Sequence, residues 1–293
     1  MVQPTGMKLP LYHVDVFTSE RFGGNPLAVF LDADDLDTET MQKLAREMNL
    51  SETTFVQRPS VANATARVRI FTPGRELPFA GHPTLGTAFV LQRTGRASDA
   101  LLFEMEAGPI AVTREESTLW MTPPPAEATS AAFDRAKVGH ALGLPVSSVM
   151  MPPQVFGGRG VEFLCVQLDT EQNVDWVMLD RHDLVAATND TVGEGNVLIV
   201  SYQAGKAYTR MFADLASNVG EDPATGSSVA PLCAALGWWR VLDQSRTQLT
   251  VTQGVAMGRP SALHARFTVE GTHLQHITVG GSCLPFYETT IEL

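Results

Sequence analysis

The alternation of apolar and polar positions in the first third of the chain predicts strands with two helices between them. Short runs rich in apolar and β-branched residues predict strands over residues 12–17, 27–31, 53–57 and 64–71. A Gly-rich turn over residues 23–26 joins the first two of these strands. The chain therefore opens with a predicted hairpin.

Two segments of the same region have helical spacing. Asp37 is a suitable N-cap for a helix whose apolar face runs from Met41 to Met48. Residues 83–93 are apolar on most sides, and Gly95 is placed as their C-terminal stop. We expect this second helix to be buried all round, because a surface helix would have a polar face.

The second half of the chain repeats this plan. Strands are predicted over residues 163–168, 196–202, 207–212 and 286–293. A helix is predicted over residues 223–236, with Gly237 as its stop. Pro231 falls inside this helix, and we expect it to kink the helix because proline lacks a backbone donor.

A run of prolines after Thr122 is the best candidate for a linker. Consecutive prolines favour extended backbone and interrupt both helices and central strands. We therefore predict two domains, residues 1–122 and 126–281. Residues 282–293 would form a terminal strand that returns to the first domain.

One motif occurs twice, 140 positions apart. Each copy ends a strand with Arg, an apolar residue and Phe, and then continues as [His/Asp]-Pro-x-x-Gly-[Thr/Ser]. Arg69 precedes His82 by 13 positions, and Arg210 precedes Asp222 by 12. This repetition predicts two structurally related α+β halves, with an active site in the cleft between them.

Composition and charge narrow the function classes. With 293 residues, 44% hydrophobic and 18% charged, the chain matches an ordinary globular protein with room for two domains. Its net charge of -11 repels nucleic acids and anionic membranes, so we expect neither as a partner. No signal peptide and no long apolar segment are apparent, which favours a cytoplasmic protein. Three widely spaced cysteines indicate reduced, buried thiols.

The repeated turns indicate where a ligand would bind. Each proline is expected at the first helical position, directly after His82 or Asp222, so that backbone N–H groups point into the cleft. Gly81 and Gly226 would allow close approach of the backbone. Two such helix starts would hold a small carboxylic acid, which we infer as the ligand.

Three ionisable residues are candidates for the chemistry. Asp222 is explained equally well as a simple helix cap. Histidine is a poor cap, so His82 indicates either proton handling or substrate binding. Glu52 stands at the mouth of an otherwise uncharged strand, where it is either an ordinary surface residue or part of the cleft. In the cleft, desolvation would raise its pKa towards the range of a general acid or base.

Six motifs, in order over nearly the whole chain, resemble those of the PhzF-like phenazine-biosynthesis isomerase family. They are Asp15-Val16-Phe17-Thr18, Gly24-Asn25-Pro26, Ser51-Glu52-Thr53, Gly81-His82-Pro83-Thr84-Leu85-Gly86, Gly220-Glu221-Asp222-Pro223-Ala224-Thr225-Gly226-Ser227, and Gln253-Gly254 with Gly258-Arg259-Pro260-Ser261. The resemblance implies a diaminopimelate epimerase-like fold. This α+β fold has two pseudo-symmetric domains, each a curved, mostly antiparallel sheet or barrel around a central helix, with the active site between them.

The resemblance also implies a chemistry. In the characterised isomerase of the family, a carboxylate moves a proton within a cyclic dihydro-hydroxyanthranilate without a metal or an organic cofactor, and the protein is a homodimer. Carried over by motif, Glu52 would be the general acid/base, and His82 and Asp222 would orient and polarise the substrate. The substrate carboxylate would be bound by Gly81, Gly226 and Ser227.

Other functions on the same fold remain open. Cofactor-independent racemases and epimerases use a pair of thiols, one beside each helix start, and neither turn of this chain contains a cysteine. A catalytically silent relative would bind a metabolite or a protein partner, and a related enzyme would catalyse an epimerisation or an elimination. Arg259 either contacts the substrate or caps a turn.

Overall fold

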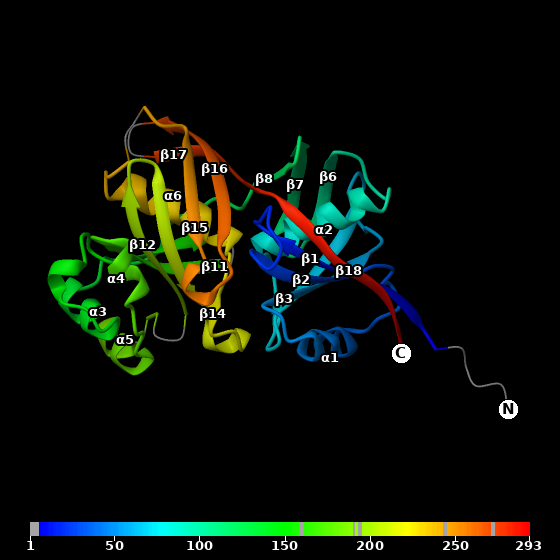
Figure 1. Cartoon of the computed structure of the whole chain (residues 1–293), viewed down its shortest axis with the longest axis horizontal. Coiled ribbons are helices and arrows are strands. Elements are labelled where there is room, and N and C mark those ends of the chain that lie inside the picture. The colour runs from blue at the N-terminus through cyan, green and yellow to red at the C-terminus, as the bar shows by residue number, and fades with distance from the viewer. Residues whose placement is uncertain (1–5, 159–160, 190, 193–194, 243–244, 271–272) are drawn as a thin grey trace.

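A computed structural model of the chain describes residues 6–158, 161–189, 191–192, 195–242, 245–270 and 273–293 (Figure 1). The strands are β1 (Lys8–Val16), β2 (Asn25–Phe30), β3 (Glu52–Gln57), β4 (Ala66–Phe71), β5 (Glu76–Leu77), β6 (Ala100–Met105), β7 (Gly108–Glu115), β8 (Thr118–Met121), β9 (Glu127–Ala128), β10 (Gln154–Gly158), β11 (Val161–Leu168), β12 (Asn196–Gln203), β13 (Lys206–Phe212), β14 (Glu221–Asp222), β15 (Gln248–Gln253), β16 (Ser261–Glu270), β17 (His273–Gly281) and β18 (Cys283–Glu292). The α-helices are α1 (Thr38–Met48), α2 (Gly81–Arg93), α3 (Arg135–Ala141), α4 (Glu171–Asp175), α5 (Arg181–Ala187) and α6 (Val229–Trp238). Short 3-10 turns are η1 (Val146–Ser148), η2 (Leu215–Ser217), η3 (Gly226–Ser228) and η4 (Val255–Met257).

The strands form a mixed sheet in which one order of pairings occurs twice. In the first group, β1–β2 is antiparallel, β2–β3 parallel, β3–β4 antiparallel and β4–β6 parallel. In the second group, β10–β11, β11–β12, β12–β13 and β13–β15 follow the same alternation. Figure 1 shows the two groups side by side, with α2 among the strands of one and α6 among those of the other.

Two further pairings connect the groups. Strand β17 is antiparallel to β8, and β18 is antiparallel to β1 from Lys8↔Glu292 to Val16↔Cys283. In Figure 1 the terminal strand β18, in red, crosses from the second group and lies along β1 of the first. The end of the chain therefore ties the two groups together.

Both helices predicted for the first group are present, and the predicted cap of α1, the burial of α2 and the glycine that follows α2 are confirmed. Asp37 caps α1 by accepting a hydrogen bond from the amide of Thr40 at 2.8 Å. Helix α2 is buried over most of its length, as its apolar sequence indicates. Gly95 follows it with a φ of 70°, a left-handed conformation that glycine adopts without strain. The apolar helix is thus a central element of its group.

The predicted start of α2 is wrong by two residues. The helix begins at Gly81, so His82 is its second residue and Pro83 its third. The capping position belongs to Ala80, whose side chain makes no capping hydrogen bond. Proline is tolerated throughout the first helical turn, because its missing N–H would have no acceptor there. The proline therefore marks the first turn without fixing its first residue.

The prediction for the second helix is also wrong at both ends. Asp222 belongs to the short strand β14, and α6 begins only at Val229, after the turn η3. The helix continues through Gly237 to Trp238. Pro231 is consequently the third residue of α6, where a missing N–H interrupts no intrahelical hydrogen bond. The reason for expecting a kink at this proline disappears.

Candidate active site

Glu52 is placed by the junction between α1 and β3. The helix ends at Asn49 in the left-handed conformation, and β3 starts three residues later, parallel to β2, with Glu52 opposite Leu27. The Glu52 side chain is only 14% exposed. Its Oε2 is buried and makes no hydrogen bond within the described part of the chain. A buried carboxyl group without a partner is costly, and such groups are typical of functional sites.

His82 and Asp222 converge on Glu52 from the two halves of the sequence. His82 lies in the first turn of α2 and Asp222 in β14, and both are buried. His82 Nδ1 is 3.6 Å from Glu52 Oε2. A ring nitrogen of His82 and one carboxylate oxygen each of Glu52 and Asp222 all lie within 4.8 Å of one another. The structure thus brings together the three residues that the motifs singled out as catalytic.

Asn25 connects two of these residues and was missed by the sequence analysis. Its buried Nδ2 lies 3.0 Å from His82 Nδ1 and donates to Asp222 Oδ1 at 2.8 Å and to the Ala224 carbonyl at 3.0 Å. Two of these acceptors are a carboxylate and a carbonyl, so the amide nitrogen and not the oxygen must face them. The sequence analysis placed Asn25 in a Gly-rich turn and in one family motif, but gave its side chain no role in the site.

The contact with Asn25 also assigns the proton of the His82 ring. The Asn25 NH2 group lies 3.0 Å from Nδ1 and offers no lone pair to a hydrogen there, so we assign the hydrogen of the neutral ring to Nε2. Burial lowers the pKa of His82 to about 3, so the ring is neutral at physiological pH. Nε2 is buried and has no hydrogen-bond partner among the described residues. His82 is therefore a neutral hydrogen-bond donor within the site.

Asp222 is fixed by a second set of polar contacts. Thr225 Oγ1 donates to its Oδ2 at 2.5 Å, and Gln253 Nε2 donates to its backbone carbonyl at 2.8 Å. Gln253 Oε1 in turn accepts from the Thr225 amide at 3.2 Å. These contacts explain why the chain after Asp222 forms a turn rather than a helix: its carboxylate binds side chains instead of capping a helix.

Burial also changes the acidity of the two carboxyl groups. It raises the pKa of Glu52 well above the usual 4.5, and the negative charges of Asp222 and Asp214 raise it further. Burial raises the pKa of Asp222 as well, while hydrogen bonds from Thr225, Ser51 and Asn25 oppose that rise. Glu52 therefore keeps its proton to a higher pH than an exposed glutamate does.

The three residues meet only some of the requirements of a metal site. One imidazole and two carboxylates are a donor set that binds divalent transition metals. However, the Asn25 amide nitrogen faces His82 Nδ1 and donates to Asp222 Oδ1, two atoms that such a metal would use. A donor N–H in that position opposes binding of a cation by these three residues.

Ser227 lines the same cavity as Glu52 and Asp222. Gly81 and Gly226 instead pack against each other, where α2 and η3 meet. A Cβ atom on Gly81 would lie 2.5 Å from the backbone of Gly226, and one on Gly226 would lie 2.8 Å from the Phe17 ring. The close backbone approach that both glycines allow is therefore between the two repeated turns.

Gly81→Ala should test how much the site depends on this contact. We expect a loss of about 1–3 kcal/mol in the free energy of unfolding, because the added methyl group must push two backbones apart. Gly220→Ala is the matched control, since its Cβ would meet nothing within 4 Å, and its change should stay within about 0.5 kcal/mol. Equal denaturation midpoints for the two variants in urea would contradict the close contact.

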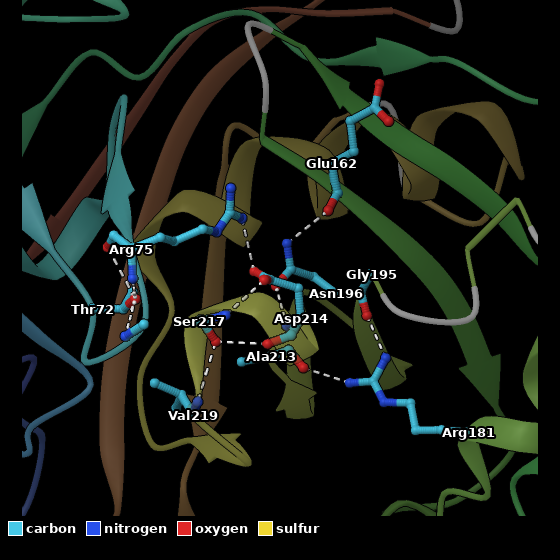
Figure 2. Close-up of polar contacts among 11 residues, drawn as sticks. Thr72, Arg75, Glu162, Arg181, Gly195, Asn196, Ala213, Asp214, Ser217 and Val219 are labelled. Carbon is cyan, nitrogen blue, oxygen red and sulfur yellow. Dashed lines mark hydrogen bonds and ion pairs between the residues drawn. The ribbon is translucent and has the colours of Figure 1, made fainter.

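The cavity has a polar rim that joins both halves of the sequence. Arg75, in the turn before β5, pairs with Asp214 at 3.1 Å. The amide of Asp214 donates to Asn196 Oδ1 at 2.9 Å, and Asn196 Nδ2 donates to the Glu162 carbonyl at 3.0 Å. Figure 2 shows these contacts, with Arg75 reaching across to Asp214. Sequence analysis did not single out Arg75 or Asp214.

The role of Arg259 in the fold is that of a turn cap. Its guanidinium donates to the carbonyls of Gly23 and Gly24 at 2.7 and 2.8 Å and pairs with Asp15 at 2.6 Å. Arg259 does not appear among the described residues that line the cavity. Arg259 therefore fixes the turn directly before Asn25, and through this turn it helps to position Asn25 in the site.

The cysteines are free and buried, as predicted. Burial raises the pKa of Cys233 and of Cys283 to about 12 and raises that of Cys165 as well. Among the described residues that line the cavity there is no cysteine. Thiols so weakly acidic are poor proton carriers at neutral pH.

Within the described residues, no helix is both long and apolar enough to cross a membrane.

A family model described as phenazine biosynthesis-like protein, PhzC-PhzF, matches residues 14–289. A trans-2,3-dihydro-3-hydroxyanthranilate isomerase from Pseudomonas aeruginosa is 38% identical over 287 residues, which cover 94% of this chain and 96% of the relative.

Solved structures share the fold. The structure of a PhzF-family phenazine biosynthesis protein from Bacillus anthracis has a TM-score of 0.84 at 24% identity, covering 98% of this chain and 100% of that one. A hydroxyproline epimerase from Agrobacterium vitis has a TM-score of 0.69 at 12% identity, covering 98% of this chain and 93% of that one. These likenesses show a mixed sheet with helices that is common to isomerases and epimerases.

Proposed function

This chain belongs to the phenazine biosynthesis-like family PhzC-PhzF and is an isomerase, and we propose that it moves a proton within a small cyclic or unsaturated carboxylic acid through the side chain of Glu52. The observation that carries the proposal is the state of Glu52. Its carboxyl group is buried, lines the cavity and has a pKa raised well above its usual value, and its Oε2 lacks a hydrogen-bond partner among the described residues.

The geometry supports a single-residue proton shuttle. As a carboxylate, Glu52 takes a proton from a carbon of the substrate, and as a carboxylic acid it returns that proton to another carbon. The electron pair left on the substrate is delocalised towards its unsaturated or carboxylate group, so no atom is gained or lost. His82, as a neutral donor, stabilises the negative charge that develops on the substrate, and Asp222 helps to orient the substrate.

We propose that the substrate carboxylate binds at the meeting point of the two repeated turns. Ser227 lines the cavity there, and amides in the first turn of a helix lack intrahelical acceptors. Gly81 and Gly226 contribute by letting the turns approach closely. No organic cofactor and no metal has a part in this proposal.

The proposal is tested by exchange of solvent deuterium into candidate acids, followed by mass spectrometry. The panel includes trans-2,3-dihydro-3-hydroxyanthranilate, the molecule named for the relatives from Pseudomonas. Exchange with rearrangement of the double bonds supports the isomerase. Exchange with inversion at one carbon identifies an epimerase, loss of a leaving group identifies an elimination, and tight binding without exchange identifies a silent relative.

We further propose that the protein is built from two pseudo-symmetric, duplicated halves and acts in the cytoplasm as a homodimer. The twice-repeated order of strand pairings supports the duplication. The division into two domains follows from the proline run after Thr122, and the dimer follows from the family resemblance. Light scattering after size exclusion should give twice the 31.7 kDa mass of one chain, whereas a single-chain mass would contradict the dimer.

The raised pKa of Glu52 also predicts how stability depends on pH. Above pH 4.5 the unfolded chain releases a proton that the folded chain keeps, so wild-type stability falls as the pH rises towards the folded pKa. Glu52→Gln removes this loss, and its stability relative to wild type should increase with pH by up to about 1.4 kcal/mol per unit. Urea denaturation from pH 5 to 8 measures the difference. A difference that does not change with pH would contradict the raised pKa of Glu52.

A further inference from the structure

The cavity contains a polar group that the proposed proton transfer does not use. Arg75 and Asp214 line it together with Glu52, and among the described lining residues Arg75 is the one basic side chain. The other charged lining residues are Glu52, Asp214 and Asp222, all of them acidic. A single guanidinium among three carboxyl groups is where an anion would gain most.

Hydrogen bonds fix the backbone of the turn that carries Arg75. Its turn is closed by Thr72, whose Oγ1 accepts hydrogen bonds from the amides of Gly74 and Arg75 at 3.2 and 3.0 Å. The Gly74 amide also donates to the Ser217 carbonyl at 3.1 Å. The turn thus docks on η2 of the second half, and the guanidinium extends over the cavity from a fixed base.

Asp214 is fixed even more firmly. Its Oδ1 accepts from the Ser217 amide at 2.9 Å, and its own amide donates to Asn196. Asp214 Oδ2 accepts a hydrogen bond from Arg75 Nη2 at 3.1 Å. Figure 2 shows a guanidinium nitrogen of Arg75 pointing away from Asp214.

The Arg75 guanidinium therefore still has N–H groups that can donate to a ligand. In the described part of the chain, its Nη1 and Nε make no hydrogen bond, and 45% of its side chain is exposed. A guanidinium offers five N–H donors in a plane that fits a carboxylate with two parallel hydrogen bonds. Asp214 uses one edge and leaves the other for a ligand.

We propose that Arg75 is a specificity-determining residue that binds a second carboxylate of the substrate, apart from the carboxylate held at the repeated turns. The inference rests on the proposed function, because it assumes that the substrate occupies the cavity beside Glu52. It identifies the substrate class as a small cyclic or unsaturated dicarboxylic acid. Asp214 acts as a positioning residue that orients the guanidinium.

The competing explanation is that the Arg75–Asp214 ion pair only stabilises the contact between the two halves and binds no ligand. The two explanations predict different results. If the ion pair is only structural, substitution of either partner should have the same effect, and that effect should not depend on the charge of the ligand. Ligand recognition depends on Arg75 and on the second carboxylate. Binding measurements with matched ring acids separate the two.

The experiment is calorimetric titration of the full chain with isophthalate, 3-carbamoylbenzoate and benzoate, which differ only in the second substituent. Arg75→Ala should weaken isophthalate binding by about ten- to a hundredfold, the range for a hydrogen bond to a charged group, and leave benzoate within about twofold. Arg75→Lys should fall between wild type and alanine for isophthalate. Arg96→Ala is the control, because it removes another exposed Arg–Asp pair far from the cavity lining.

Asp214→Asn completes the design, since asparagine still accepts from the Ser217 amide but loses the charge. It should keep isophthalate affinity within about threefold of wild type, because the released guanidinium remains available. An equal loss for all three ligands in Arg75→Ala, no loss for isophthalate, or an identical loss in Asp214→Asn would each overturn the proposal. Binding needs no turnover, so the same titration in Glu52→Gln separates failure of this inference from failure of the proton-transfer function.

Discussion

Glu52→Gln is expected to lower the rate of solvent-deuterium exchange by about 10²- to 10⁴-fold, the contribution typical of a positioned general acid or base. Glutamine has the same shape and fills the same space, but its amide neither takes nor gives a proton at neutral pH. The substrate should still bind, because the proposed contacts to its carboxylate come from the repeated turns. The expected signature is a reduced kcat with a nearly unchanged KM.

Two measurements distinguish lost chemistry from lost structure. Glu52 Oε2 makes no hydrogen bond within the described residues, so its replacement breaks no network, and circular dichroism and urea denaturation should show an intact fold. Glu47→Gln is the control, because it makes the same change at an exposed position on α1 and should leave exchange unchanged. Exchange at the wild-type rate in Glu52→Gln would remove Glu52 from the mechanism.

The catalytic candidates were predictable because each lies in a locally recognisable motif. Glu52 follows a helix and opens a strand, and His82 and Asp222 stand before prolines in two copies of one pattern. Repetition alone indicated that the two turns face each other. The distance of 3.6 Å between His82 and Glu52, and the absence of a described partner for the Glu52 oxygen, required the folded chain.

The helix starts were less predictable because one local signal fits two structures. An acidic residue followed by proline is typical of a helix N-terminus, but it also suits a strand that ends in a turn. At Asp222 the second structure forms, since Thr225 and Gln253 bind the carboxylate and the backbone. Gln253 is 31 positions away from Asp222, so nothing in the local sequence reveals this competition.

Asn25 and Arg75 were missed for a related reason. Asn25 is 197 positions from Asp222, and Arg75 is 139 positions from Asp214. Each lies in a turn rich in glycine and proline, where polar residues are ordinary. Contacts that connect two halves of a chain leave no periodic pattern within either half. The hydrogen bonds that orient the candidate catalytic residues are therefore the part of the site that sequence reveals least.

Asn25→Ala should be the most destabilising single change in the site. It leaves the Ala224 carbonyl, the Asp222 carboxylate and His82 Nδ1 without their shared donor in a buried environment. Each buried group left unsatisfied costs about 1–3 kcal/mol, so we expect a loss of about 3 kcal/mol or more in the free energy of unfolding. Exchange activity should fall as well, because the His82 ring loses the contact that keeps its proton on Nε2.

Thr53→Val is the control for removing a buried polar atom next to the site. Thr53 is buried, and its Oγ1 makes no hydrogen bond in the described structure, so valine should be neutral or slightly stabilising. A loss in Thr53→Val as large as that in Asn25→Ala would show that the region tolerates no substitution, and it would remove the argument from hydrogen bonding.

Asn25→Asp gives the sharper test, because it keeps the shape of the side chain and replaces its amide donor with a carboxyl group that titrates. At neutral pH the new carboxylate faces Asp222 and the Ala224 carbonyl without a hydrogen to offer, so the variant should be at least as unstable as Asn25→Ala. Lowering the pH protonates the new side chain and restores one donor. Its stability deficit relative to wild type should then shrink between pH 7 and pH 5, whereas the deficit of Asn25→Ala, which gains no donor, should change less. Parallel pH profiles of the two variants in urea denaturation would contradict the assignment of Asn25 as the donor that joins His82 to Asp222.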